Sequence, residues 1–280
     1  MTMLHCPRVS AFMPHTIAAA ILTFAMATGA IAQTQPTVSD KNQRLDQVAI
    51  DLMRESAEFL ASRPAFSFTW FVSYDEVVED REKITFVRSG SNLVVRDKGF
   101  FSRADGENGR REYFYNQKQF VISAPDENFY AAKEFNDGFE ALVEKVRNAT
   151  DTEIPIYAIM SRNLGNGLEQ GLQGAAYLGS TNLAGRPVHH LAFSEQDEDW
   201  QIWISTDNTA PLPLMIIGTN TKQKGWPQYR AYLTNWNLKP KYDTAQFSFR
   251  PDDDDLKVTM PELKKRNAGS PSAAGKQQKN

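Results

Sequence analysis

The spacing of hydrophobic residues along the chain changes at Pro64. Before this proline, apolar residues over 45–60 recur three and four positions apart, which predicts an amphipathic helix that the proline ends. Asp40 with Gln43 resembles a capping box at the start of that helix. After the proline, aromatic and polar residues alternate over 66–75. This period of two predicts a long strand with one strongly aromatic face.

Further alternating segments, joined by short polar turns, fill most of the chain up to residue 250. The dipeptides between them are typical of turns: Ser89-Gly90, Asp105-Gly106, Asn108-Gly109 and Ala184-Gly185. Dense strands with hairpin turns predict an antiparallel meander. The additional predicted strands are 82–88, 92–97, 100–104, 111–115, 118–123, 128–132, 175–182, 187–194, 199–205, 212–219, 228–238 and 246–249.

A helical insertion interrupts this meander. Asp137 with Glu140 predicts the capped start of a second helix, and a short apolar helix with a proline near its start follows over 154–160. Leucines then recur every four residues among five glycines, and each glycine weakens a helix by about 1 kcal/mol relative to alanine. The segment from Ile154 to Leu172 is therefore predicted to be an apolar, poorly fixed lid.

Several predicted strands are apolar on both faces, as in 199–205, where Trp200 and Ile202 alternate with Gln201 and Trp203. A sheet with two apolar faces must cover both of them. We therefore predict an α+β fold: a single strongly curved antiparallel sheet, an unclosed β-barrel of about 11 strands, with three or four helices as plug or lid. Its concave face is predicted to hold an apolar cavity; the alternative is that the helices fill it.

The N-terminus resembles a secretory signal peptide. Arg8 precedes an apolar stretch shorter than the about 20 residues that span a bilayer, and Ala30-Ile31-Ala32 follows as small-x-small. Cleavage is expected after Ala32; an uncleaved anchor helix is the alternative. The predicted organisation is a signal peptide over 1–32, a flexible leader over 33–39, a single domain over 40–261 and a disordered tail over 262–280.

Composition narrows the class of protein and its compartment. The chain has 280 residues, of which 41% are apolar and 23% charged, with a net charge of −3, so it is neither a disordered chain nor a basic nucleic-acid binder. Cys6 is the only cysteine and precedes the apolar stretch, so the mature chain is expected to have no disulfide, cysteine nucleophile or lipidated cysteine. We predict an exported periplasmic protein without a transmembrane segment.

No motif with fixed catalytic spacing was found: there is no nucleophile elbow, zincin motif, P-loop or dinucleotide fingerprint. His189 and His190 are adjacent on a predicted strand, so they face opposite ways and cannot share a metal ion. We expect no catalytic residue, cofactor or metal. The open alternatives are a hydrolase that uses His190 and a weak Ca²⁺ site at Asp197 and Asp199.

Arginines recur across neighbouring predicted strands. Their forked donors suit phosphate and carboxylate groups, so they are candidates for binding an anionic headgroup at the cavity rim. The alternative is ordinary cross-strand pairing with Asp97, Asp105 and Glu112. The headgroup candidates are Arg88, Arg96 and Arg103, with Arg110 and Arg111 nearby.

Blocks in both halves of the chain resemble one bacterial family. They read PAFSFTWFVSYDEV and REYFYNQKQFVISAPDENFYA in the first half, and VHHLAFSEQDEDWQIWI, PLPLMIIG and PQYRAYLTNWNL in the second. These blocks resemble a family of predicted periplasmic proteins of unknown function over roughly residues 45–250. The chain departs from its pattern at Val188, where relatives often carry cysteine, and after Arg250-Pro251, where four aspartates replace a proline- and glycine-rich ending.

That family is similar in architecture to the lipoprotein-carrier (LolA/LolB-like) superfamily, whose bent sheets hold acyl chains under a helical lid. The resemblance implies a non-enzymatic carrier or sensor that binds a lipid, acyl chain or lipoprotein. The alternatives are a regulatory or scaffold protein that acts through an envelope protein partner, and the hydrolase. The residues expected to line the cavity are Phe68, Trp70, Phe101, Met160, Leu168, Trp200, Ile202, Met215 and Trp236.

Overall fold

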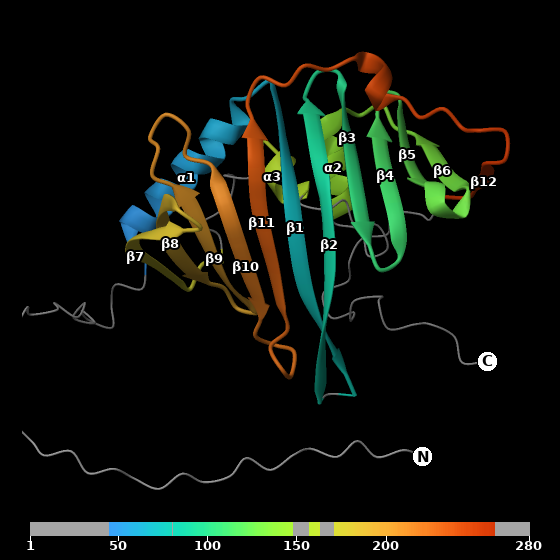
Figure 1. Cartoon of the computed structure of the whole chain (residues 1–280). Coiled ribbons are helices and arrows are strands. Elements are labelled where there is room, and N and C mark those ends of the chain that lie inside the picture. The colour runs from blue at the N-terminus through green and yellow to red at the C-terminus, as the bar shows by residue number, and fades with distance from the viewer. Residues whose placement is uncertain (1–44, 80, 148–156, 163–170, 261–280) are drawn as a thin grey trace, which may run out of the picture. The chain divides into compact units, whose positions relative to one another are not determined.

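One twelve-stranded sheet contains all strands in the described part of the chain (Figure 1). The computed structural model describes residues 45–79, 81–147, 157–162 and 171–260. The strand order is β12-β6-β5-β4-β3-β2-β1-β11-β10-β9-β8-β7. All neighbouring strands are antiparallel except β12 and β6. The predicted fold class, a single unclosed and strongly curved sheet with few helices, is confirmed.

The strands and helices follow the chain in two halves around the helical insertion. The first half contains α1 Gln47–Ala61, β1 Ala65–Val78, β2 Glu82–Val95, β3 Gly99–Gly106, β4 Gly109–Tyr115, β5 Gln119–Ala124, the 3₁₀ turn η1 Pro125–Glu127 and β6 Phe129–Glu134. The insertion provides α2 Phe139–Arg147 and α3 Tyr157–Met160. The second half contains β7 Gly174–Leu183, β8 Arg186–Ser194, β9 Glu198–Ser205, β10 Pro213–Asn220, β11 Gln228–Asn237, the 3₁₀ turn η2 Thr244–Phe247 and β12 Leu256–Val258.

The two halves join at the middle of the sheet, where β1 pairs with β11. Thr69 and Thr234, which are 165 residues apart in the sequence, face each other across this join with their hydroxyls 2.8 Å apart. The centre of the sheet is therefore built from the two ends of the domain.

Three details of the sheet differ from the sequence prediction. The segments 82–88 and 92–97 form one continuous strand, β2, so Ser89-Gly90 is not a turn. The segment 246–249 is not a strand, because Asp243 caps the 3₁₀ turn η2 there. The short strand β12 was not predicted, and its parallel pairing with β6 gives twelve strands instead of about eleven.

Gly90 is a glycine because of packing inside β2. A Cβ atom at this position would collide with the carbonyl oxygen of Arg103 and lie 2.5 Å from Cζ2 of Trp70. The indole of Trp70 therefore occupies the place that a side chain would fill. From sequence alone, this close approach was indistinguishable from a turn glycine.

The side chains of β1 alternate as its sequence predicts. Phe66, Phe68, Trp70 and Val72 are buried, and the residues between them face the other way. Helices α1, α2 and α3 lie on the same side of the sheet as these buried residues (Figure 1). We call this the concave face and the opposite side the convex face.

Helix α1 begins at Gln47, not near Asp40, which lies outside the described residues together with Gln43. Its cap is Asp46, whose Oδ1 accepts from the backbone N–H of Val48 at 2.9 Å. The Oδ2 atom of Asp46 accepts from the N–H of Tyr177 at 3.0 Å. The capping residue therefore also attaches the helix to edge strand β7.

The convex face is partly covered by the chain that follows β11. Phe247 of η2 is buried, and the ring of Phe249 lies 5.4 Å from Phe114 and 4.9 Å from Tyr130. The sequence correctly indicated that both faces need cover. It did not show that this segment covers one of them.

Arg96, directly after β2, connects all three helices to the sheet. Its guanidinium donates to the carbonyl oxygens of Arg63 at 2.9 Å, Leu60 at 3.1 Å and Met160 at 2.8 Å. It also pairs with the carboxylate of Glu140 in α2 at 2.9 Å, and its side chain is 2% exposed. Burial lowers the pKa of Arg96, and the charge of Glu140 opposes that shift. The buried cation thus satisfies the C-terminal carbonyls of α1 and α3.

We expect Arg96→Met to lower the free energy of unfolding by about 3 kcal/mol, because it leaves three carbonyls and Glu140 without their donor. Urea unfolding followed by tryptophan fluorescence measures this loss. The control is Arg103→Met, whose half-exposed ion pair contributes less than about 1 kcal/mol. Equal losses in the two variants would contradict the role of Arg96.

Candidate ligand-binding site on the concave face

The predicted lining residues divide between the two faces of the sheet. Phe68, Trp70, Trp200, Ile202 and Trp236 face the concave side, where α3 also carries Met160. Phe101 and Met215 face the convex side, because they alternate with concave residues on β3 and β10. Leu168 lies outside the described residues, as does most of the predicted lid.

The part of the concave face beneath the helices is packed with the protein's own side chains. Phe68 and Trp70 are 1% and 3% exposed, and Met160 is fully buried. The indole N–H of Trp70 donates to Oδ1 of Asn92 at 3.1 Å, and the hydroxyl of Ser102 donates to the same atom at 2.7 Å. These residues form core, which agrees with the alternative that helices fill this part of the concave face.

A row of aromatic residues crosses the concave face on the side of the β1–β2 and β10–β11 hairpins, which Figure 1 shows at the bottom. Its Phe193 end packs with residues of α1. Each member is the register partner of the next across adjacent strands, with one glycine in the row. The members, from β8 through β9, β10, β11 and β1 to β2, are Phe193, Trp200, Gly218, Tyr229, Tyr74 and Phe86. We call this set the aromatic row.

The aromatic row is ordered by stacking yet remains partly open to solvent. Phe193 and Trp200 stack with centroids 4.1 Å apart, and Tyr74 and Phe86 stack at 5.6 Å. Tyr229 is 40% exposed, and Trp200, Tyr74 and Phe86 are half-buried. Exposed aromatic surface of this kind marks binding sites more often than isolated apolar residues do. The row is the strongest candidate site among the described residues.

Sequence reasoning found only part of the row. Trp200 was predicted as a lining residue, whereas Tyr74, Phe86 and Tyr229 were not. The signal for Tyr74 was present, because the aromatic alternation of β1 continues from Trp70 to this residue. Tyr229 and Phe86 required the register, which places them on either side of Tyr74.

The five arginines do not converge on one site. Arg88 and Arg111 face the concave side, whereas Arg103 and Arg110 face the convex side and share Asp105 at 2.9 Å each. Arg111 pairs with Glu127 at 3.0 Å. Asp105 was correctly named as a cross-strand partner. Because Arg96 is buried among carbonyls and Arg103 is on the other face, only Arg88 adjoins the aromatic row.

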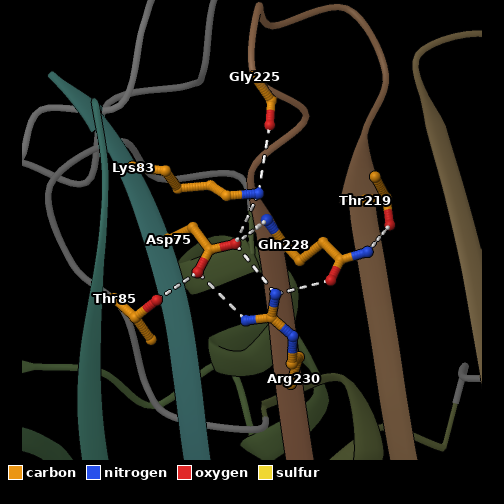
Figure 2. A network of polar contacts seen from close by, with 7 residues as sticks. All are labelled: Asp75, Lys83, Thr85, Thr219, Gly225, Gln228 and Arg230. Atoms are coloured by element: carbon orange, nitrogen blue, oxygen red, sulfur yellow. Dashed lines mark hydrogen bonds and ion pairs between the residues drawn. The ribbon is translucent and has the colours of Figure 1, made fainter. Parts of the chain in front are cut away.

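A second polar cluster lies on the convex face around Asp75 (Figure 2). The carboxylate is buried and accepts from Thr85 at 2.8 Å, from the N–H of Gln228 at 3.1 Å and from both terminal nitrogens of Arg230 at 3.1 and 3.2 Å. Lys83 lies 3.7 Å away. The cluster joins β1 and β2 to β11.

The pKa of Asp75 results from opposing effects. Burial raises it, but the hydrogen bonds from Arg230, Thr85 and the Gln228 N–H lower it more, so the pKa lies below its usual value. Asp75 is therefore a buried anion whose charge its partners hold in place.

Neither of two open hollows among the described residues contains a member of the aromatic row. One has a volume of about 430 Å³ and adjoins the Asp75 cluster; it is lined by Lys83, Thr219, Gly225, Trp226 and Gln228. The other, of about 530 Å³, lies between β4, β5 and the segment around η2. Both have mixed polar and apolar linings, unlike the aromatic row.

The two histidines point to opposite faces, as predicted. His190 stacks on Trp203 at 4.1 Å and bonds to Gln201 at 2.9 Å, and Nδ1 of His189 lies 3.0 Å from the hydroxyl of Tyr177. Asp197, a residue of the alternative Ca²⁺ site, pairs with Lys222 at 3.2 Å. Within the described ranges, no three His, Cys, Asp or Glu side chains converge as a metal site would require. No helix in those ranges has the length and apolar character of a transmembrane span.

Comparison with known proteins gives one family and several distant structures. The family described as "Predicted periplasmic protein (DUF2092)" matches residues 49–260. This agrees with the resemblance and the periplasmic location predicted from the sequence. A search of curated proteins found no match.

Solved structures similar to this chain include three proteins of low sequence identity. LprF from Mycobacterium bovis is 11% identical, with 70% of this chain and 96% of that chain covered and a TM-score of 0.42. The matching chain of the MucA/MucB complex from Pseudomonas aeruginosa is 16% identical, with 72% of this chain and 61% of that chain covered and a TM-score of 0.39. A LolA superfamily protein from Nitrosomonas europaea is 9% identical, with 72% of this chain and 97% of that chain covered and a TM-score of 0.33.

We expect Asp75→Asn to lower the free energy of unfolding by about 2 kcal/mol at pH 7, because the amide cannot replace a carboxylate that accepts four bonds. A group whose pKa is lowered by folding stabilises the protein above its unfolded pKa, near 4, and loses that effect as pH falls through its folded pKa. The difference between wild type and variant should therefore shrink below about pH 4. Urea titrations from pH 3 to 7 test this, and a difference independent of pH would contradict it.

Proposed function

The chain belongs to the DUF2092 family of predicted periplasmic proteins, and from that premise we propose that it is a non-enzymatic binding protein for a lipid, acyl chain or acylated protein. The ligand would lie along the aromatic row on the concave face. The members that contact it are Trp200, Tyr229, Tyr74 and Phe86, in place of the packed residues Phe68 and Trp70.

One observation carries this proposal: aromatic side chains continue across adjacent strands on the face that the helices cover only in part. A solvated sheet face ordinarily carries polar side chains. Leaving Tyr229 and its neighbours exposed forgoes the favourable burial of their rings, unless a ligand buries them. An extended alkyl chain fits such a row because it needs no directed polar contact.

The driving force would be removal of apolar surface from water. Each buried CH₂ group contributes about 0.8 kcal/mol, so affinity rises with chain length. The stacked pairs hold their rings in place before binding, which reduces the entropy lost when the ligand is bound. Whether the protein carries or senses its ligand, the same contacts would be made.

A second candidate function is binding of an envelope protein partner. The observation that favours it is on the convex face, where Phe71 and Tyr232 are 44% and 37% exposed and their rings lie 6.4 Å apart. This pair lies on the opposite side of the sheet from the aromatic row, so the two functions can be separated by substitution.

Strand β11 offers a matched pair of variants. Tyr229 and Tyr232 have similar exposure, 40% and 37%, but lie on opposite faces. We expect Tyr229→Ser to weaken binding of hexadecanol, a neutral long-chain ligand, by roughly tenfold. The substitution removes the exposed part of the aromatic ring, which would contact the alkyl chain. Tyr232→Ser should leave the affinity unchanged. The measurement is displacement of a fluorescent apolar dye from the purified protein.

The outcome distinguishes the candidates. Equal affinity of both variants and wild type for hexadecanol would rule out the aromatic row as the site. Native mass spectrometry of protein isolated from the periplasm adds an independent test, because a bound lipid should be released from wild type. Loss of a stoichiometric protein partner in Tyr232→Ser alone would favour the second candidate.

A further inference from the structure

Arg88 places a positive charge beside the aromatic row. It lies on β2, two residues after Phe86 and on the same face of the sheet. Its guanidinium stacks over the ring of Tyr74 with Cζ 4.9 Å from the ring centroid, and Nη2 donates to the Tyr74 hydroxyl at 2.9 Å. The side chain is therefore held against the aromatic row.

The stem of Arg88 is also fixed by close packing. A Cβ atom on Gly106 of β3, the register partner of Arg88, would lie 2.7 Å from Cγ of Arg88. The glycine leaves the space in which the stem lies. This packing and the Tyr74 contact together give the guanidinium a defined position.

Arg88 differs from the other arginines of this part of the sheet in having no carboxylate partner within 4 Å among the described residues. Arg96, Arg103, Arg110, Arg111 and Arg230 each pair with an aspartate or glutamate. A half-buried guanidinium whose only described hydrogen bond is to a neutral phenol retains donors for an oxyanion.

Tyr74 adds a second donor at the same place. Its oxygen accepts from Arg88, so its own O–H hydrogen can point to another acceptor. Burial raises the pKa of Tyr74, and the charge of Arg88 opposes that shift, so the phenol is protonated at neutral pH. An oxyanion beside Arg88 would thus receive hydrogen bonds from both residues.

We propose that the ligand is an anionic acyl lipid, whose carboxylate or phosphate is bound by Arg88 and the hydroxyl of Tyr74. This inference rests on the proposed function, because the alkyl chain occupies the aromatic row. Arg88 and Tyr74 determine the headgroup, and the row binds the chain. The two parts are separable by experiment.

The test uses three ligands with the same chain: hexadecanol, hexadecanoic acid and hexadecyl phosphate, each below its micelle concentration. Affinities are measured by dye displacement for the full mature chain and for Arg88→Met, Tyr74→Phe and Arg103→Met. Wild type should bind at least one anion roughly tenfold more tightly than the alcohol, the effect expected of charge-assisted hydrogen bonds. The anion that binds more tightly identifies the headgroup chemistry.

The ratio between anion and alcohol affinities is the readout, so a general weakening of binding does not imitate the loss of headgroup recognition. Arg88→Met should bring this ratio close to one, Tyr74→Phe should lower it, and Arg103→Met on the convex face should keep it. Equal binding of all three ligands by wild type, or a preference that survives Arg88→Met, would overturn the inference while leaving the proposed function intact. Binding of none of the three would overturn both.

Discussion

One buried cation joins all three described helices to the sheet. Arg96 is bound by the carbonyl ends of α1 and α3 and by a carboxylate of α2, so three helices from distant parts of the sequence share one guanidinium. Its charge is compensated by Glu140 and by the negative ends of the helices. The helices cover one part of the concave face: α1 packs at the Phe193 end of the aromatic row, whereas Tyr229 is 40% exposed. Arg96, directly after β2, thus helps to fix where the helices lie on the concave face.

A second constraint is the strict alternation of strands. A residue's face follows from its register, so side chains close in sequence serve different surfaces. Tyr229 belongs to the candidate site and Tyr232 to the convex face, although they share one strand. The same rule divides the arginines: Arg88 adjoins aromatic rings, whereas Arg103 and Arg110 share a carboxylate on the other side. Each face therefore makes its own set of contacts even though the sequence of each strand is mixed.

Local patterns predicted the elements well and their contacts poorly. The helix before Pro64, the long strand after it and the Ala184-Gly185 hairpin all follow from periods and turn residues. The identity of the concave face did not follow, because Phe68 and Phe71 are equally apolar and only the position of the helices distinguishes them. Register and long-range packing decide such questions, and neither is encoded in a local window.

The same limit applies to single residues. Ser89-Gly90 is a dipeptide typical of turns, but Gly90 lies inside β2 and leaves space for the indole of Trp70. Arg96 was predicted to bind a headgroup at the cavity rim, but it is buried among carbonyl groups. In both cases the deciding neighbour comes from another element. Arg88 was predicted as a headgroup ligand from its residue type alone. Its contact with Tyr74 could be recognised only from the register between β1 and β2.

The join of β1 and β11 has a consequence for biogenesis. Because the central ladder connects residues 165 positions apart, the sheet cannot be completed until nearly all of the domain is available. Closing such a long loop costs conformational entropy before the strand contacts that stabilise it have formed, and this makes folding slow. The central ladder of this sheet therefore forms late, only after β11 has become available to pair with β1.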